Sequence, residues 1–128
     1  METHKDLRVW QKSMDLVTSV YLETQSFPKE ECFGLVSQLR RASVSVPSNI
    51  AEGYARGTDK EKLHFLRISS GSISEVETQL ILSRNLGYIN EEKYTELTEA
   101  LTAVWKQLNS LISSINKRLT TQDLMCFE

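Results

Sequence analysis

The chain has 128 residues, of which 40% are hydrophobic and 25% are charged, and these proportions are typical of one soluble globular domain. Fifteen basic and 17 acidic residues give a formal net charge of -2, which favours neither a nucleic acid nor an anionic membrane as the partner. The chain contains only five glycines and two prolines, too few for the many turns of an all-β fold.

The first predicted helix covers residues 5–26. Its apolar side chains alternate three and four positions apart, which places them on one face of a helix: Leu7, Trp10, Met14, Val17 and Tyr21. Pro28 disfavours helix at the preceding residue and ends the element. The N-terminal stretch METHKDLRVWQKS lacks the apolar run of a signal peptide. No later stretch is apolar enough to span a membrane. We therefore expect a cytoplasmic protein without a membrane partner.

The second predicted helix covers residues 29–56 and contains Pro47. Its core stripe consists of Leu35, Leu39, Ala42, Val46, Asn49 and Gly53. Because proline has no amide hydrogen, the carbonyl of Ser43 loses its helical partner, and we expect a kink at Pro47 within one helix. Val46 and Ile50 should both be buried. The amide of Asn49 should form hydrogen bonds inside the bundle.

The segment RRASVSVPSNIAEGYARGT, residues 40–58, concentrates unusual residues within this helix. Those singled out are Arg40, Arg41, Pro47, Asn49, Glu52, Gly53 and Arg56. One interpretation is a kinked helix with a satisfied polar cluster, in which Glu52 pairs with Arg56 at a favourable helical spacing. The other is an anion or partner site formed by the three arginines, with Lys60 nearby. The sequence leaves both open.

The third predicted helix covers residues 59–86 and begins at a capping box formed by Thr58 and Glu61. Its stripe is Leu63, Leu66, Ser70, Ile73, Glu77 and Leu80. We expect the helix to continue through ISSGSIS, residues 68–74, because the stripe keeps its phase there. Gly71 costs about 1 kcal/mol relative to alanine in this position.

The fourth predicted helix covers residues 91–119 and is capped by Asn90. Its stripe is Tyr94, Leu97, Leu101, Val104, Leu108, Leu111 and Ile115. Residues 120–128 are predicted to form a loose tail. Short connections place successive helices antiparallel, so the predicted fold is all-α, an up-down-up-down four-helix bundle with its second helix kinked.

Five apolar residues lie beside the main stripes of the third and fourth helices: Phe65, Ile68, Val76, Trp105 and Ile112. They either widen the core or face a partner subunit. Exposed apolar surface on a soluble protein usually marks an interface, so we treat them as a candidate subunit interface.

The strings DLRVWQKSMDL, RRASVSVPSNIAEGYARGT and HFLRISSGSISEVETQL resemble a bacterial four-helix-bundle family, the 23S rRNA intervening-sequence proteins, over residues 6–119. The resemblance implies up-down bundles that assemble into homopentamers. A distant relative of that family, the accessory variability-determinant protein of diversity-generating retroelements, binds a reverse transcriptase and RNA. That relation implies RNA or a nucleic-acid-processing protein as a further partner.

The sequence contains no recognisable catalytic or metal-binding constellation. His4 and His64 are the only histidines, and Glu61 with His64 forms a single Glu-x-x-His where a di-metal site needs two. Cys32 and Cys126 form no zinc motif. We therefore expect no cofactor and no enzymatic activity. The predicted function is a homo-oligomeric scaffold or adaptor, and the alternative is RNA binding through Arg40, Arg41 and Arg56.

Overall fold

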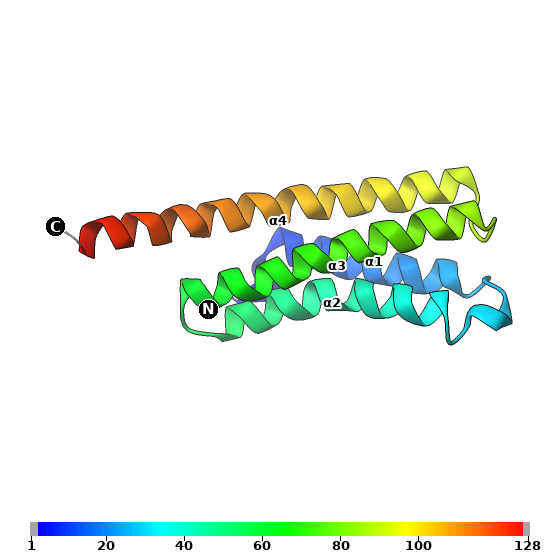
Figure 1. The fold of residues 1–128 in the computed structure, drawn as a ribbon, viewed down its shortest axis with the longest axis horizontal. Coiled ribbons are helices and arrows are strands. Elements are labelled where there is room, and N and C mark those ends of the chain that lie inside the picture. Colours follow the sequence, from blue (N-terminus) through cyan, green and yellow to red (C-terminus); the bar gives the residue numbers. More distant parts are fainter. Residues whose placement is uncertain (1–2, 127–128) are drawn as a thin grey trace.

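The computed structural model describes residues 3–126, and it describes side chains as far as Gln122. Four long helices follow one another along the chain: α1 (Arg8–Thr24), α2 (Leu35–Ala55), α3 (Asp59–Asn85) and α4 (Glu91–Cys126). The single-turn 3-10 helices η1 (His4–Asp6) and η2 (Lys29–Glu31) precede α1 and α2. Successive long helices run antiparallel (Figure 1), and α1 and α3 each pack against both α2 and α4. The predicted all-α, up-down-up-down bundle is confirmed.

One hydrophobic core runs along the axis of the bundle. Its fully buried side chains are aliphatic and come from all four helices: Leu16, Val20, Leu39, Val46, Ile50, Leu66, Val76, Leu80, Val104, Leu108 and Ile115. Val46 and Ile50 are both buried, as predicted. Most of the predicted stripes of α2 and α4 lie in this core.

The predicted core face of α1 is wrong. Met14 and Tyr21 are exposed, whereas the residues that α1 buries are Val9, Ser13, Leu16, Val20 and Thr24. Ser13 donates its hydroxyl to the carbonyl of Trp10 at 2.8 Å, and Thr24 donates to the carbonyl of Val20 at 2.7 Å. Because these hydroxyls are satisfied by their own helix, they can be buried without an unpaired polar group.

Helix α2 begins six residues later than predicted, at Leu35 rather than residue 29. The chain first forms η2 and then a turn that ends at Gly34, where the Oε1 atom of Glu31 accepts a hydrogen bond from the amide of Leu35 at 3.4 Å. From Leu35 to Ala55 the helix is continuous through a buried Pro47. The placement of Pro47 inside one helix is therefore confirmed, while the kink stays a prediction.

Helix α4 is longer than predicted, because residues 120–126 of the expected tail continue it. This stretch contains no glycine or proline to stop a helix. The hydroxyls of Thr120 and Thr121 donate to the carbonyls one turn earlier, each at 3.0 Å. Residues 127–128 of the predicted tail lie outside the described residues. Figure 1 shows α4 projecting past the ends of the other helices.

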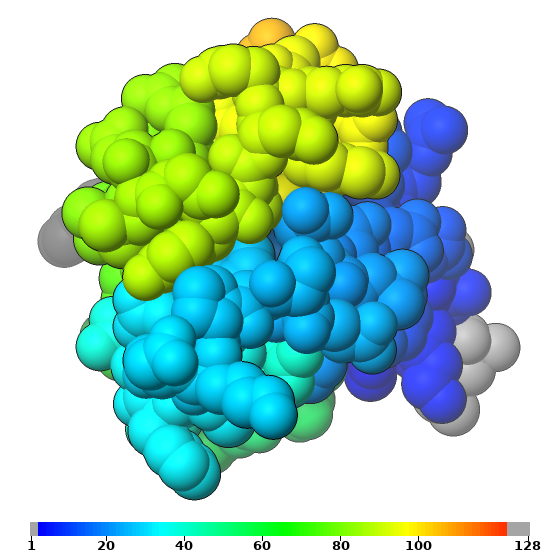
Figure 2. Space-filling model, turned by 90° about the vertical axis from the view of Figure 1, so that its right-hand side faces the viewer, coloured from blue at the N-terminus to red at the C-terminus, as the bar shows by residue number. Residues whose placement is uncertain are grey.

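At the opposite end, η2 and the α3–α4 turn lie side by side (Figure 2). The turn forms because Gly87 adopts a φ of 76°, which ends α3. Tyr88, the next residue, donates its hydroxyl to Oε2 of Glu31 at 2.9 Å. This hydrogen bond raises the pKa of Tyr88, so the phenol stays protonated and continues to link the two connections at neutral pH.

Candidate functional site

Asn49 and Ser45 of the 40–58 segment form a small polar cluster that reaches α3. The side-chain amide of Asn49 donates to the carbonyl of Ser45 at 2.8 Å and to its hydroxyl at 2.9 Å. The hydroxyls of Ser45 and Ser72 are 2.7 Å apart, which links the two helices. Asn49 thus forms side-chain hydrogen bonds as predicted. Its partner is Ser45 of the same helix.

Gly53 allows α2 and α3 to approach closely. A Cβ atom at this position would lie 3.1 Å from the Cβ of Phe65 and 3.3 Å from the carbonyl oxygen of Lys62. Farther along the same contact, the buried hydroxyl of Ser69 donates to the carbonyl of Val46 at 2.8 Å. Gly53, Ser45 and Ser69 therefore hold two helices together, and the geometry gives them a packing role.

Arg40 is turned toward α1 and is engaged by it. Its Nε donates to the hydroxyl of Thr24 at 2.9 Å, and a terminal nitrogen donates to the carbonyl of Tyr21 at 3.3 Å. The guanidinium also lies 4.4 Å from the centre of the Tyr21 ring. Three contacts to one neighbouring helix make Arg40 a structural residue in the monomer.

Arg56 is engaged as well, by Glu52 one turn earlier. The shortest distance between its guanidinium and the Glu52 carboxylate is 2.7 Å, and the guanidinium lies 5.2 Å from the centre of the Phe65 ring. Both members of the ion pair are half exposed, so the pair stabilises the helix end by only about 0.3–0.5 kcal/mol.

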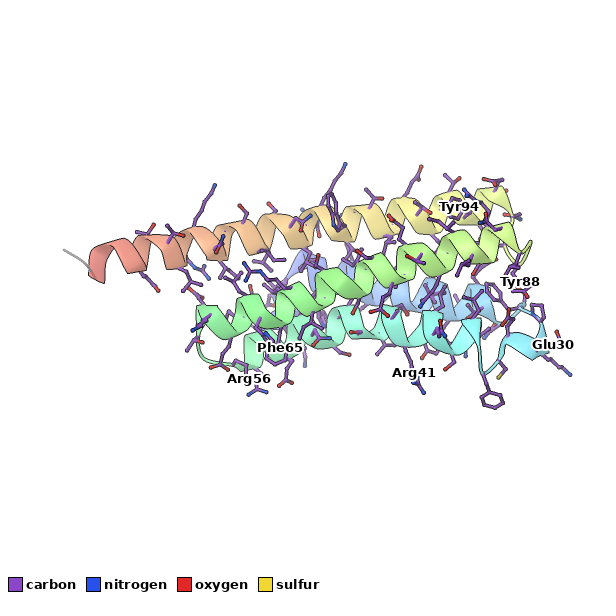
Figure 3. The ribbon with its side chains drawn as sticks, viewed as in Figure 1. Glu30, Arg41, Arg56, Phe65, Tyr88 and Tyr94 are labelled. Atoms are coloured by element: carbon purple, nitrogen blue, oxygen red, sulfur yellow. The ribbon has the colours of Figure 1, made fainter. Side chains whose placement is uncertain are left out.

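The predicted basic patch is consequently dispersed. Arg41, Lys60 and Arg67 are exposed and form no ion pair with the residues that the structure describes. Arg41 lies in the first half of α2 and Arg56 follows its last residue (Figure 3), so a helical rise of about 20 Å separates them. Of the three predicted arginines, only Arg41 is both exposed and unpaired.

The five residues of the predicted subunit interface fall into three environments. Ile68 and Trp105 are exposed, at 40% and 45%, and Phe65 and Ile112 are half buried. Val76 is wholly buried in the core, so its assignment to an interface is wrong. The predicted stripe of the third helix included Glu77, but Glu77 is exposed. The core face of α3 runs through the neighbouring Val76 instead.

Phe33 was not predicted as a site residue, yet at 96% it is the most exposed large apolar residue among those whose side chains the structure describes. Phe33 lies in the turn between η2 and α2, outside every helical stripe, and its only sequence signal is a bulky apolar residue directly before Gly34. It lines a shallow hollow of about 710 Å³ over α1 and α2, which we call the arginine hollow. Six of its lining residues are Tyr21, Phe33, Val36, Arg40, Arg41 and Val44.

A second hollow lies between α3 and α4, and we call it the Trp105 hollow. It has a volume of about 380 Å³ and is lined by Ile73, Ser74, Glu77, Leu101, Thr102 and Trp105. Glu77 forms no ion pair with the described residues. Each of the two hollows thus combines apolar side chains with an unpaired charge, positive in one and negative in the other.

A third hollow, of about 720 Å³, lies at the N-terminal end between η1 and α2. It includes Tyr54, whose pKa is raised chiefly by burial. Tyr54 therefore stays protonated and cannot serve as a base near neutral pH. Among the described residues, no group of three or more His, Cys, Asp or Glu side chains could hold a metal ion.

Comparison with known proteins gives the family. The sequence profile described as "23S rRNA-intervening sequence protein" matches residues 5–110. The chain belongs to this family. A crystal structure of a protein of unknown function from the S23 ribosomal protein family of Bacteroides thetaiotaomicron VPI-5482 has the same fold, with a TM-score of 0.74 and 26% sequence identity. The similarity covers 81% of this chain and 97% of that one. A comparison with curated proteins found no match.

The family resemblance stated from the sequence is thus confirmed, and so is the all-helical architecture that it implies. The matched region contains the whole motif of α2 and both hollows, but it stops at residue 110, well before the end of α4. The family description and the solved structure assign no catalytic activity to this fold. No helix in the described part of the chain is long and apolar enough to cross a lipid bilayer.

Proposed function

We propose that this protein is a non-enzymatic homo-oligomeric scaffold. The observation that carries the proposal is large apolar side chains outside a core that is already filled. Among the side chains that the structure describes, nine large apolar ones are exposed: Met14, Tyr21, Leu22, Phe33, Val44, Ile68, Leu82, Leu86 and Trp105. Tyr21, Phe33, Val44 and Trp105 of this set line the two hollows. Exposed apolar surface favours association, because burial of that surface is favourable by about 25 cal/mol per Å².

The two aromatic residues Phe33 and Trp105 support this proposal most directly. Both lie beside hollows, on different pairs of helices. Aromatic residues of this kind dominate the energetics of protein interfaces when they are buried in pockets. A scaffold that uses both would have two binding faces for its own copies.

The proposed number of subunits is five. This number follows from the family resemblance described above, since helical geometry sets no stoichiometry. Five copies would also repeat any surface feature around a ring, so that a single exposed charge becomes a band of charge.

RNA binding is the second candidate function, and the exposed cations Arg41, Lys60 and Arg67 favour it. Against it, Arg40 and Arg56 are engaged within the chain and the net charge is -2. We therefore expect any binding of ribosomal RNA to be weak at low salt and lost at about 0.3 M salt, because a surface that neutralises few phosphates gains little affinity from counterion release. A mobility shift that persists above that salt concentration would promote this candidate.

Light scattering coupled to gel filtration tests the scaffold proposal. The expected mass is about five times that of the 14.7 kDa chain. On dilution, the Trp105→Lys assembly should dissociate at a higher protein concentration than the native assembly does. Ser110→Lys, on an exposed site of the same helix, should keep the native mass. Circular dichroism checks that both variants fold. A stable monomer of the native chain at micromolar concentration would overturn the proposal.

A further inference from the structure

The arginine hollow and the Trp105 hollow have complementary chemistry. Arg41, on the first, is exposed and has no ion pair with the described residues, and the same is true of Glu77 on the second. The first hollow presents two aromatic rings and two guanidinium groups. The second presents an exposed indole beside a carboxylate.

The arginine hollow is partly organised before any partner arrives. Arg40 is fixed by its hydrogen bonds to Thr24 and Tyr21 and by its position over the Tyr21 ring. An ordered guanidinium loses little conformational freedom on binding, and the face of an indole is a favourable surface for it. Phe33, which is 96% exposed, adds a second aromatic wall that has little contact with its own chain.

The two hollows cannot meet within one molecule. One is lined by residues of α1, α2 and the turn between them, and the other by residues of α3 and α4. They share no lining residue and lie over different pairs of helices. Any pairing between them must therefore join two copies of the chain.

From these observations we infer that the Trp105 hollow of one copy docks on the arginine hollow of the next. In this contact Trp105 lies among the aromatic and arginine side chains, and Glu77 faces Arg41. The inference rests on the proposed function and specifies its interface. Each copy has one surface of each kind, so the contact is head-to-tail and can continue from copy to copy until a ring closes.

Charge exchange tests this contact on the full chain by light scattering. Arg41→Glu and Glu77→Arg should each raise the concentration at which half of the assembly dissociates by about tenfold or more, because each places like charges opposite one another. The double variant Arg41→Glu with Glu77→Arg should recover most of the native assembly. Lys12→Glu and Asp15→Arg, on exposed sites of α1, are matched controls and should keep the native mass.

The outcomes separate this inference from the proposal on which it depends. A native chain that is monomeric overturns both. A native oligomer that survives both single variants overturns the assigned faces and leaves the scaffold proposal standing. Single variants that dissociate without recovery in the double variant overturn the pairing of Arg41 with Glu77. A two-fold dimer joined through identical Trp105 surfaces would overturn the head-to-tail arrangement.

Discussion

Helices α2 and α3 contact each other in a different way from α4 and its neighbours. Between α2 and α3 the contact uses small and polar residues, among them Ser45, Gly53, Ser69 and Ser72, and interhelical hydrogen bonds cross it. The seam of α4 uses apolar side chains throughout: Leu97, Leu101, Val104, Leu108 and Ile115. Interaxial distance depends on the side chains at the contact, so the first pair can approach more closely.

This difference separates two contributions to the fold. Truncating a fully buried leucine of the α4 seam removes apolar burial and leaves a cavity, which costs more than the loss of one hydrogen bond. Hydrogen bonds between α2 and α3 add little net free energy, but they form only when the two helices are aligned in one register. Substitutions in the α4 seam should therefore lower the free energy of unfolding more than substitutions at the contact between α2 and α3.

The largest effect is expected for Leu108→Ala on α4. Leu108 is fully buried, and its truncation should lower the free energy of unfolding by about 2–5 kcal/mol through lost burial and a residual cavity. Chemical denaturation measures this value. Leu82→Ala, at an exposed leucine of α3, is the control and should cost far less. Equal losses at the two sites would contradict the proposed contribution of the α4 seam.

The next effect is expected for Gly53→Leu on α2. The added side chain would collide with backbone and Cβ atoms of α3, which cannot retreat as a flexible side chain can. We expect a loss of about 1–3 kcal/mol from overpacking. The matched change Gly71→Leu has no atom within 4 Å of its Cβ in this chain. Gly71→Leu should stabilise the monomer by up to about 1 kcal/mol, because leucine has the higher helix propensity. Destabilisation by both substitutions would refute the argument that α2 and α3 approach closely at Gly53.

A smaller loss is expected for Ser69→Ala. The substitution removes the hydrogen bond to the carbonyl of Val46. It leaves no buried donor unpaired, and the expected cost is about 1 kcal/mol. Thermal unfolding of Ser69→Ala beside Ser74→Ala, where the serine is exposed, measures it. A loss as large as that of Leu108→Ala would reverse the ranking of the two contacts.

The smallest effect is expected for Asn49→Leu. Both hydrogen bonds of the Asn49 side chain end on Ser45 of the same helix, so removing them breaks no link between helices. We expect a change within about 1 kcal/mol and an unchanged oligomeric mass. A change of oligomeric state would show that the amide specifies the assembly.

The sequence predicted the number of helices and most of the apolar seams of α2 and α4, because heptad spacing of aliphatic residues there agrees with burial. The core-facing side was predicted wrongly for α1 and for part of α3, for one physical reason. Buried serine and threonine, such as Ser13 and Ser69, count as polar in a sequence pattern although a backbone carbonyl satisfies each hydroxyl. Large residues such as Met14 then define the wrong face.

The candidate site was less predictable than the fold. The motif of α2 identified Arg41, but it also included Arg40, whose partners come from 16 to 19 positions away in the chain. Such tertiary partners have no local sequence signal. Phe33 was missed because a residue in a turn belongs to no periodic pattern, and its exposure follows only from how the turn leaves η2.

The extension of α4 has a consequence for local stability. The ion pair between Arg118 and Asp59, at 2.9 Å, and the half-buried Leu119 are its last described contacts with the bundle. Residues 120–122 are exposed, so the helix over this stretch depends mainly on its own hydrogen bonds, which are marginal for a short segment. Backbone amides of residues 120–122 should exchange with deuterium far faster than those around Leu108, because this part of α4 can open locally while its middle opens only with the whole domain.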